Sequence, residues 1–364
     1  LWSVYLLART HDPRFAAQRF RRDAAKQAVP QARAAFRPQL SFSSSLSRAY
    51  DDDFEHSDSL QSSVSLNQRL YNRSSSLALQ QARHRVGASE ANYREAEQDL
   101  ILRVAQAYFS VLAMTDNLAL SERNQAAIGR QLELALERLT AGLGTRTDLF
   151  DAEARYESAV ADGIQAAKLL DDANQGLMLL TGSNPGTLRA VHPAAQLTPP
   201  EPNEPDSWID AALKNNYRLV AEKHSLSVAQ LAVAKQQAAR LPTLRAGVSG
   251  SFTDSEQTDS TRTSFSINLS IPLLEGGLVR SQIKEAALNL NAARRDYESS
   301  RRQVHIDTRR AFLTISTRLR RIEALAEAVQ AGMGALRAKE AGFTAGLNTN
   351  IEVLDAQRAL FSAE

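Results

Sequence analysis

An internal repeat constrains this sequence more than any other feature. The segment that begins Ala141-Gly-Leu is matched, 204 residues later, by the segment that begins Ala345-Gly-Leu. The same offset aligns Ala8 with Ala212, Pro38 with Pro242, Leu40 with Leu244, and Ala107-Tyr108 with Ala311-Phe312. A constant offset across separate segments indicates that one structural unit has been duplicated. The sequence therefore predicts a fold in which the same unit occurs twice in tandem.

The repeat also predicts the domain boundaries. We expect the first repeat at 1–182 and the second at 206–364, joined by a linker at 183–205 that is rich in proline and polar residues. By the offset, Glu364 corresponds to position 160 of the first repeat. The first repeat continues as a helix to about residue 180, where Gly182 favours a stop. We therefore expect the final helix of the second repeat to be truncated and the native chain to run further.

Four segments alternate apolar and polar residues with a period of two, as around Phe42, Val64, Val248 and Ile267. This pattern predicts β-strands. We expect them at about 39–49 and 60–70 in the first repeat, and at about 243–253 and 263–272 in the second. Roughly ten residues allow a tilted strand to cross a bilayer. The strands of each pair are joined by acidic, polar loops at 51–58 and 254–261.

Each strand pair is followed by a long run without proline, at 74–141 and 278–345. At 1.5 Å per residue, either run could form a helix of about 100 Å. In the first run, Leu100, Val104, Ala107 and Val111 recur at alternating steps of four and three, which is typical of a coiled-coil seam. A further helix is expected at 148–180, after a tight turn.

Composition excludes several classes of function. The 43 basic and 41 acidic residues are interspersed, so bulk charge indicates no nucleic-acid partner. The chain has no cysteine, its six histidines show no metal-ligand spacing, and phosphate-binding loops and nucleophile elbows are absent. We therefore expect no catalytic, cofactor-binding or metal-binding residues and no enzyme activity. Because no stretch of 18 apolar residues occurs, any span of a bilayer would have to be made of strands.

Two hairpins are too few strands to close a membrane barrel. Exposed edge N–H and C=O groups cost several kcal/mol each in lipid, and single-sheet membrane barrels begin at about eight strands. At least two chains must therefore share one barrel, and three would give twelve strands. The alternative is a soluble coiled-coil scaffold or interaction protein, which explains the long helices but leaves the paired strands unexplained.

The turns carry a family resemblance. The motif from Arg138 through Gly142-Leu143 to Asp148 and Asp151 recurs as Gly346-Leu347 with Glu352-Val-Leu-Asp355, and Pro272-Leu-Leu-Glu-Gly276 follows the last strand. With these motifs the chain resembles the TolC family of outer-membrane factors over essentially its whole length. The resemblance implies a mixed α+β membrane protein, in which a homotrimer forms a twelve-stranded barrel in the outer membrane of a Gram-negative bacterium, continued by a periplasmic tunnel of long helices.

The same resemblance implies the function. We expect a channel subunit that exports drugs or proteins from the periplasmic side to the exterior, within a tripartite efflux or type I secretion system. The implied partners are further copies of the chain, outer-membrane lipid, a periplasmic adaptor, and an inner-membrane transporter that is either an ABC or a proton-driven one. No cofactor is implied.

The resemblance also places a pore constriction at Thr147, Asp148, Glu352 and Asp355. Glu352 and Asp355 are one helical turn apart and so share a face. Three copies would form a carboxylate ring that favours cations and whose crowding raises proton affinity. The simpler interpretation is that acidic residues in a first helical turn complement the helix dipole.

At the positions where many members carry a latching Tyr and Arg, this chain has Phe343 and Asn348. A latch of that form is therefore not expected, and Arg146, Thr147 and Asp148 are candidates to replace it.

The resemblance further makes Gly142, Leu143, Gly346 and Leu347 the surface that docks the adaptor. Independently of docking, each Gly-Leu pair predicts a helix C-cap, in which the glycine is left-handed and the leucine packs back on the helix.

Overall fold

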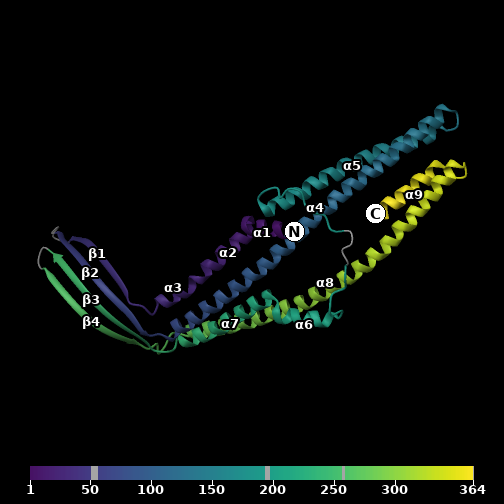
Figure 1. The fold of residues 1–364 in the computed structure, drawn as a ribbon. Coiled ribbons are helices and arrows are strands. Elements are labelled where there is room, and N and C mark those ends of the chain that lie inside the picture. The colour runs from purple at the N-terminus through teal and green to yellow at the C-terminus, as the bar shows by residue number, and fades with distance from the viewer. Residues whose placement is uncertain (51–55, 193–196, 256–258, 364) are drawn as a thin grey trace. The chain divides into compact units, whose positions relative to one another are not determined.

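A computed structural model describes residues 1–50, 56–192, 197–255 and 259–363. The centres of both expected acidic loops lie outside the described residues. Figure 1 shows the order of the elements. The first repeat contains α1 (Trp2–His11), α2 (Pro13–Lys26), α3 (Ala28–Ala34), β1 (Gln39–Tyr50), β2 (His56–Tyr71), α4 (Arg73–Thr140) and α5 (Arg146–Thr181). The second contains α6 (Pro205–Asn215), α7 (Tyr217–Ala238), β3 (Thr243–Ser255), β4 (Ser260–Ser270), α8 (Leu278–Thr344) and α9 (Asn350–Ala363).

The chain divides into two compact units, and both repeats contribute to each of them. The first unit is Leu1–Ala17, Ala96–Ala212 and His305–Glu364, and the second is Gln18–Glu95 and Leu213–Val304. The boundaries of the repeats in the sequence therefore differ from those of the compact units, because each unit combines segments that are far apart along the chain.

The second unit contains one antiparallel sheet in the order β1-β2-β3-β4. The two hairpins join through β2 and β3, so the outer edges of β1 and β4 have no partner strand among the described residues. All four strands overlap the ranges that the period-two pattern predicts, although β4 begins three residues and ends two residues before its expected bounds. β2 and β3 extend further into the hairpins than expected, because antiparallel pairing continues there, as between Arg48 and Asp58.

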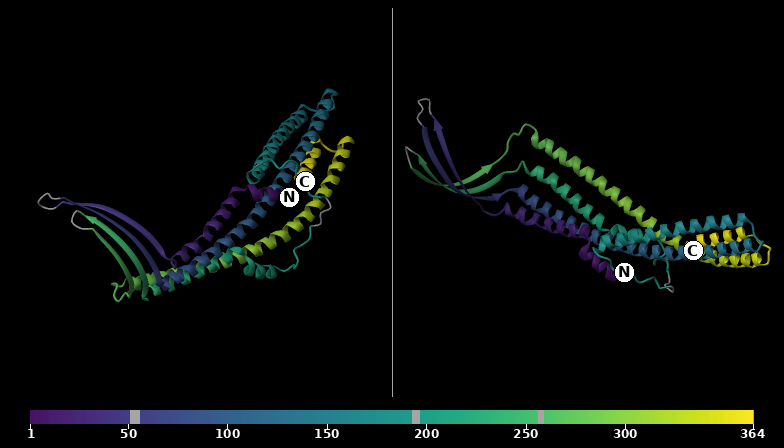
Figure 2. Two further views of the ribbon diagram at one scale, coloured as in Figure 1. Left: turned by 60° about the vertical axis from the view of Figure 1, so that its left-hand side comes forward. Right: turned by 90° about the horizontal axis from the view of Figure 1, so that it is seen from above.

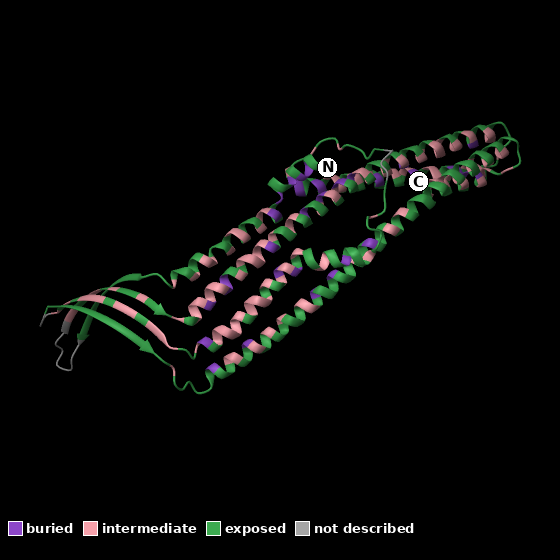
Figure 3. Cartoon of the chain, turned by 60° about the horizontal axis from the view of Figure 1, so that its bottom comes forward, coloured by how far each residue is buried: buried purple, intermediate pink, exposed green. Residues whose placement is uncertain are grey.

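The two faces of this sheet differ in chemistry. One row of paired residues is apolar across all four strands and runs through Leu40, Leu66, Val248 and Phe265. The adjacent row, on the opposite face, consists of Ser41, Ser65, Ser249 and Ser264. Leu40 is 72% and Phe265 80% exposed, so the apolar face is not covered by the rest of the described chain. Figure 3 shows the contrast between this open sheet and the buried positions along the helices.

The first unit has a small core between helices. α1 packs against α5, and the seam predicted in α4 is buried there through Leu100, Val104 and Val111. Asp12, which is almost fully buried, accepts a hydrogen bond from the Arg103 guanidinium at 2.7 Å. Further along this unit, α4 with α5, and α8 with α9, form two helical hairpins (Figure 2). Among the described helices, none is both long enough and apolar enough to span a bilayer.

Candidate functional site

The turn between α4 and α5 is a Schellman motif. Gly142 has φ 73°, in the left-handed region that glycine adopts without strain. The Leu143 N–H donates to the Arg138 carbonyl at 2.8 Å, and the Gly142 N–H donates to the Leu139 carbonyl at 3.1 Å. These bonds satisfy carbonyls that the helix end would otherwise leave unpaired.

The turn between α8 and α9 repeats this geometry. Gly346 has φ 75°, and the Leu347 N–H donates to the Gly342 carbonyl at 2.7 Å. The side-chain oxygen of Asn348 occupies the space where residue 342 would carry a Cβ, 1.9 Å from that position. Glycine at 342 therefore permits Asn348 to fold back over the helix end.

Both leucines point into solvent, which corrects the expectation that they pack back. Leu143 is 78% and Leu347 is 83% exposed. In a Schellman motif this residue usually contacts an apolar side chain at the position of its carbonyl partner. Here those partners are Arg138 and Gly342, which offer no such apolar surface. The left-handed glycines were predicted correctly, whereas the leucines are exposed apolar tips.

The acidic residues next to the turns form capping boxes. The Asp148 N–H donates to Thr145 Oγ1 at 3.1 Å, and Asp148 Oδ2 accepts from the Thr145 N–H at 3.1 Å. In the second repeat, Glu352 and Thr349 make the same exchange at 3.3 and 2.8 Å. The signal was present in the sequence as Thr-x-x-Asp and Thr-x-x-Glu at the repeat offset, and it agrees with the simpler interpretation of acidic residues in a first turn.

Glu352 has further partners within its own chain. Lys339 Nζ donates to Oε1 at 2.9 Å, and Asn348 Nδ2 donates to Oε2 at 3.2 Å. The hydrogen bond from Lys339, followed by those from the Thr349 N–H and Asn348, lowers the pKa of Glu352 to about 2. The contacts within one chain thus lower the pKa of Glu352, whereas crowding between copies was expected to raise it.

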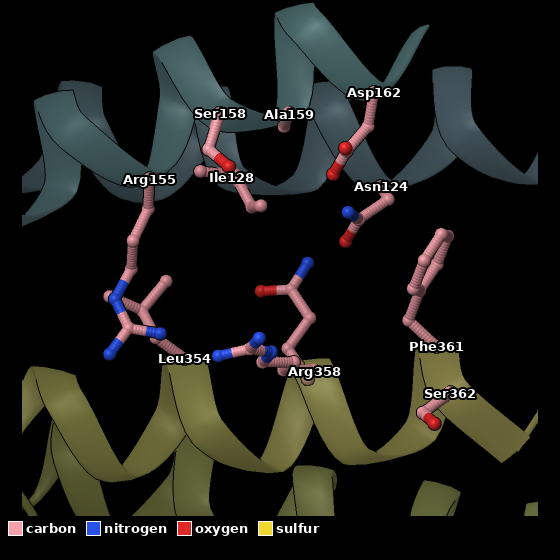
Figure 4. Close-up of a pocket in the computed structure, with 11 residues that line it drawn as sticks. Asn124, Ile128, Arg155, Ser158, Ala159, Asp162, Leu354, Arg358, Phe361 and Ser362 are labelled. Atoms are coloured by element: carbon pink, nitrogen blue, oxygen red, sulfur yellow. The ribbon is translucent and has the colours of Figure 1, made fainter. Parts of the chain in front are cut away.

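The remaining residues expected at the constriction lie nearby. Thr147 is exposed. Asp355 is 63% exposed and accepts a hydrogen bond from Arg155 at 3.2 Å. Figure 4 shows Arg155 extending from α5 toward α9 along a pocket of about 400 Å³, whose lining also includes Asp162 and Arg358. Arg155 was not identified from the sequence, because its partner is 200 residues away.

Phe343, which stands where many family members carry a latching Tyr, contacts an arginine of the other repeat. The Arg138 guanidinium lies 4.3 Å from the centre of the Phe343 ring, within the range of a cation–π interaction. Both residues, with Leu143, Asp148 and Asn348, line a cavity of about 260 Å³ between the two turns. The structure thus brings the sites predicted in the two repeats together.

Comparison with known proteins agrees with this architecture. The model of the family described as "Outer membrane efflux protein" matches residues 4–183 and 208–364. Among similar proteins, the outer membrane protein TolC of Vibrio cholerae is 31% identical, over 100% of this chain and 85% of its own. The alkaline protease secretion protein AprF of Pseudomonas aeruginosa is 28% identical, over 99% and 78%. The solved structure of CusC superposes with a TM-score of 0.87 at 18% identity, over 99% and 86%, a likeness of fold.

Proposed function

The chain belongs to the outer membrane efflux protein family, and on this basis we propose that three copies assemble into one export channel. The chain is an outer-membrane channel subunit for efflux or type I secretion, and the family is one of transport proteins. The proposal adds the trimer, its twelve-stranded barrel and its helical tunnel. It also divides the chain into repeats at 1–182 and 206–364 with a linker at 183–205.

The open sheet is the observation that carries the proposal. Among the described residues, the outer edges of β1 and β4 have no partner strand, and one face of the sheet is apolar while the other carries serines. Membrane barrels place apolar residues toward lipid and polar residues toward a lumen, and they have no free edges. Three sheets joined edge to edge satisfy both conditions with twelve strands. The alternative function, a coiled-coil scaffold, does not explain a sheet with one apolar and one polar face.

The repeat indicates how neighbouring copies meet. Within one chain, His84 of α4 contacts His224 of α7. The residues that correspond to them by the offset of 204 are Leu288 of α8 and Phe20 of α2. These two are 59% and 64% exposed, so the part of the chain that the structure describes does not make the equivalent contact. We infer that Phe20 of one copy packs on Leu288 of the next.

The turns are the proposed docking surface for the periplasmic adaptor. Gly142 and Gly346 set the direction of each turn, and Leu143 and Leu347 project as exposed apolar tips. A buried apolar anchor is the usual centre of a protein interface. An adaptor seated there would link the channel to an inner-membrane transporter, either ABC or proton-driven. Drugs and proteins are both proposed as cargo, since efflux and protease secretion both occur among the names of the family and its relatives.

The residues near the turns are the proposed constriction. Three copies of Thr147, Asp148, Glu352 and Asp355 would form rings of hydroxyl and carboxylate groups. Asp355 is the most accessible of the carboxylates that have ion-pair partners there. Such rings attract cations and repel anions.

Disulfide cross-linking tests the assembly. Residues 1–364 contain no cysteine, so Phe20→Cys with Leu288→Cys introduces a single pair into this part of the protein. Under oxidation, we expect the outer-membrane protein to form covalent dimers and trimers and nothing larger. The pair His84→Cys with His224→Cys is the matched control, which should cross-link within one chain and run as a monomer. If the Phe20/Leu288 pair stays monomeric while the control reacts, the proposed arrangement is wrong.

A further inference from the structure

Two histidines from different repeats meet in the second unit. His84 of α4 and His224 of α7 place their Nδ1 atoms 3.2 Å apart, and their ring centres are 5.4 Å apart. Both side chains are half-buried. As neutral rings, one Nδ1–H can donate to the other nitrogen, so the pair forms a satisfied hydrogen bond without any ligand. The question is whether this geometry also suits a shared ligand.

The separation fits a metal chelate. Imidazole nitrogens bind first-row divalent ions at about 2.0–2.1 Å, and at a tetrahedral angle two such nitrogens are about 3.3 Å apart. The observed 3.2 Å therefore matches the separation that two nitrogens bound to one ion would have.

The surroundings of the His224 ring favour its neutral form. Burial, together with the neighbouring His84 and Lys223, lowers the pKa of His224 from its ordinary value of 6.5. A neutral imidazole is the form that ligates a metal, and the lowered pKa favours that form for His224.

The helices hold the two rings in place. Gln81, one turn before His84, donates from Nε2 to the Val228 carbonyl of α7 at 3.1 Å. A Cβ at Gly87 would lie within 2.7–3.0 Å of three atoms of the His224 ring. Glycine at 87 thus lets the ring lie against α4. The pair is therefore preorganised, which reduces the entropy that binding would otherwise cost.

The fold does not require histidine at these positions. The corresponding residues of the other repeat are Leu288 and Phe20, so the repeated framework accepts apolar side chains at these two positions. The paired nitrogens are thus a feature added to one half of a repeated framework.

We propose that His84 and His224 bind one divalent transition-metal ion per chain, bridging α4 of the first repeat to α7 of the second. Among the described residues, no third His, Cys, Asp or Glu completes a three-ligand cluster, so water fills the remaining positions. A site with two imidazole ligands follows the general order of affinity, in which Cu²⁺ exceeds Ni²⁺ and Zn²⁺, and Mn²⁺ is weakest.

Metal binding to the full-length protein, purified in detergent with a tag that lacks histidine, tests the proposal. We expect calorimetric titration with CuCl₂ to give one site per chain, and the electron paramagnetic resonance spectrum to show two equatorial nitrogens. The double variant His84→Leu/His224→Phe carries the residues of the other repeat, whose apolar side chains cannot ligate a metal. We expect it to lose this site and its spectrum, with at least a tenfold fall in affinity.

The single variant His305→Gln is the matched control, since it removes a histidine of α8 outside the pair and should leave the site unchanged. Two results would overturn the proposal: wild-type protein that binds no Cu²⁺ at one equivalent, or a double variant that binds as tightly as wild type. Neither result depends on export activity, so the test of metal binding is independent of the proposed channel function.

Discussion

Individual side chains at the turns have local partners before any assembly forms. Asp148 and Glu352 complete capping boxes, and Glu352 also accepts hydrogen bonds from Lys339 and Asn348. A carboxylate held by several donors stays ionised to lower pH than a free one. Glu352 would therefore enter any ring formed between copies with a pKa already lowered by partners in its own chain.

The first prediction concerns Lys339. Lys339→Met removes the largest cause of the low Glu352 pKa, which should rise from about 2 toward its ordinary 4.5. In wild type, the hydrogen bonds to ionised Glu352 stabilise the turn fully above about pH 4.5 and are lost as pH falls toward about 2. We therefore expect cation block of single channels to persist below pH 4.5 in wild type and to weaken at a higher pH in the variant than in wild type. Lys339→Arg should behave as wild type, and identical pH profiles for all three proteins would contradict this account.

A second prediction tests the constriction itself. Glu352→Ala with Asp355→Ala removes two carboxylates per chain, or six per trimer, so block by multivalent cations and cation selectivity should both fall. Single-channel recording in planar bilayers measures both quantities. Asp172→Ala is a suitable control, since this exposed carboxylate pairs only locally with Lys168 on α5. Unchanged block in the double variant would place the constriction elsewhere.

At the scale of elements, the helical hairpins depend on two left-handed glycines. No described residue has an atom within 4 Å of a Cβ added at Gly142 or Gly346, so the requirement for glycine comes from the backbone conformation. The duplicated turn thus needs only a glycine, a Thr-based cap and an acidic third residue, all of which are local in sequence.

The third prediction follows from this geometry. Gly346→Ala should destabilise the α8–α9 turn by about 1–2 kcal/mol, the cost of a left-handed residue with a Cβ. Gly334→Ala, within α8 and also without neighbours at its Cβ, should instead stabilise the helix by up to about 1 kcal/mol. Amide hydrogen exchange at each position measures the local opening. Equal exchange rates at the turn in wild type and Gly346→Ala would show that alanine at position 346 does not destabilise the turn.

At the scale of the whole molecule, the exposed apolar surfaces are best explained as interfaces. The apolar face of the sheet, the pair Phe20 and Leu288, and the tips Leu143 and Leu347 are all uncovered in one chain. Exposed apolar patches of this kind mark sites of contact with lipid or protein. Each surface corresponds to a different proposed contact: lipid, a neighbouring copy and the adaptor.

The fourth prediction separates docking from assembly. Leu143→Asp with Leu347→Asp places charges where an adaptor would bury an apolar anchor, so export should be abolished. Trimers should still form, because the tips are distant in sequence from the strands and from the Phe20 and Leu288 contact. Export assays and cross-linking in the same cells measure the two effects. Conservative Leu143→Met with Leu347→Met should retain export, and full export by the Asp variant would exclude the tips as the docking surface.

The sequence by itself determined the features that depend on periodicity and local chemistry. The offset of 204, the alternation around Phe42 and Ile267, and the glycine turns predicted the repeats, the strands and the helix ends. These features follow from steric rules that act over a few residues, so they can be recognised without a structure. The Thr-x-x-Asp and Thr-x-x-Glu capping boxes are equally local in sequence, but they were identified only in the structure.

Only the tertiary structure decided which distant residues meet. Arg138 lies on Phe343, Arg155 binds Asp355, and His84 contacts His224, across separations of 140 to 205 residues. No periodicity encodes these pairings, because each depends on how two long helices align and rotate when they pack. The same holds for Glu352, whose carboxylate was placed correctly at a helix start but whose low pKa depends on Lys339 from another helix.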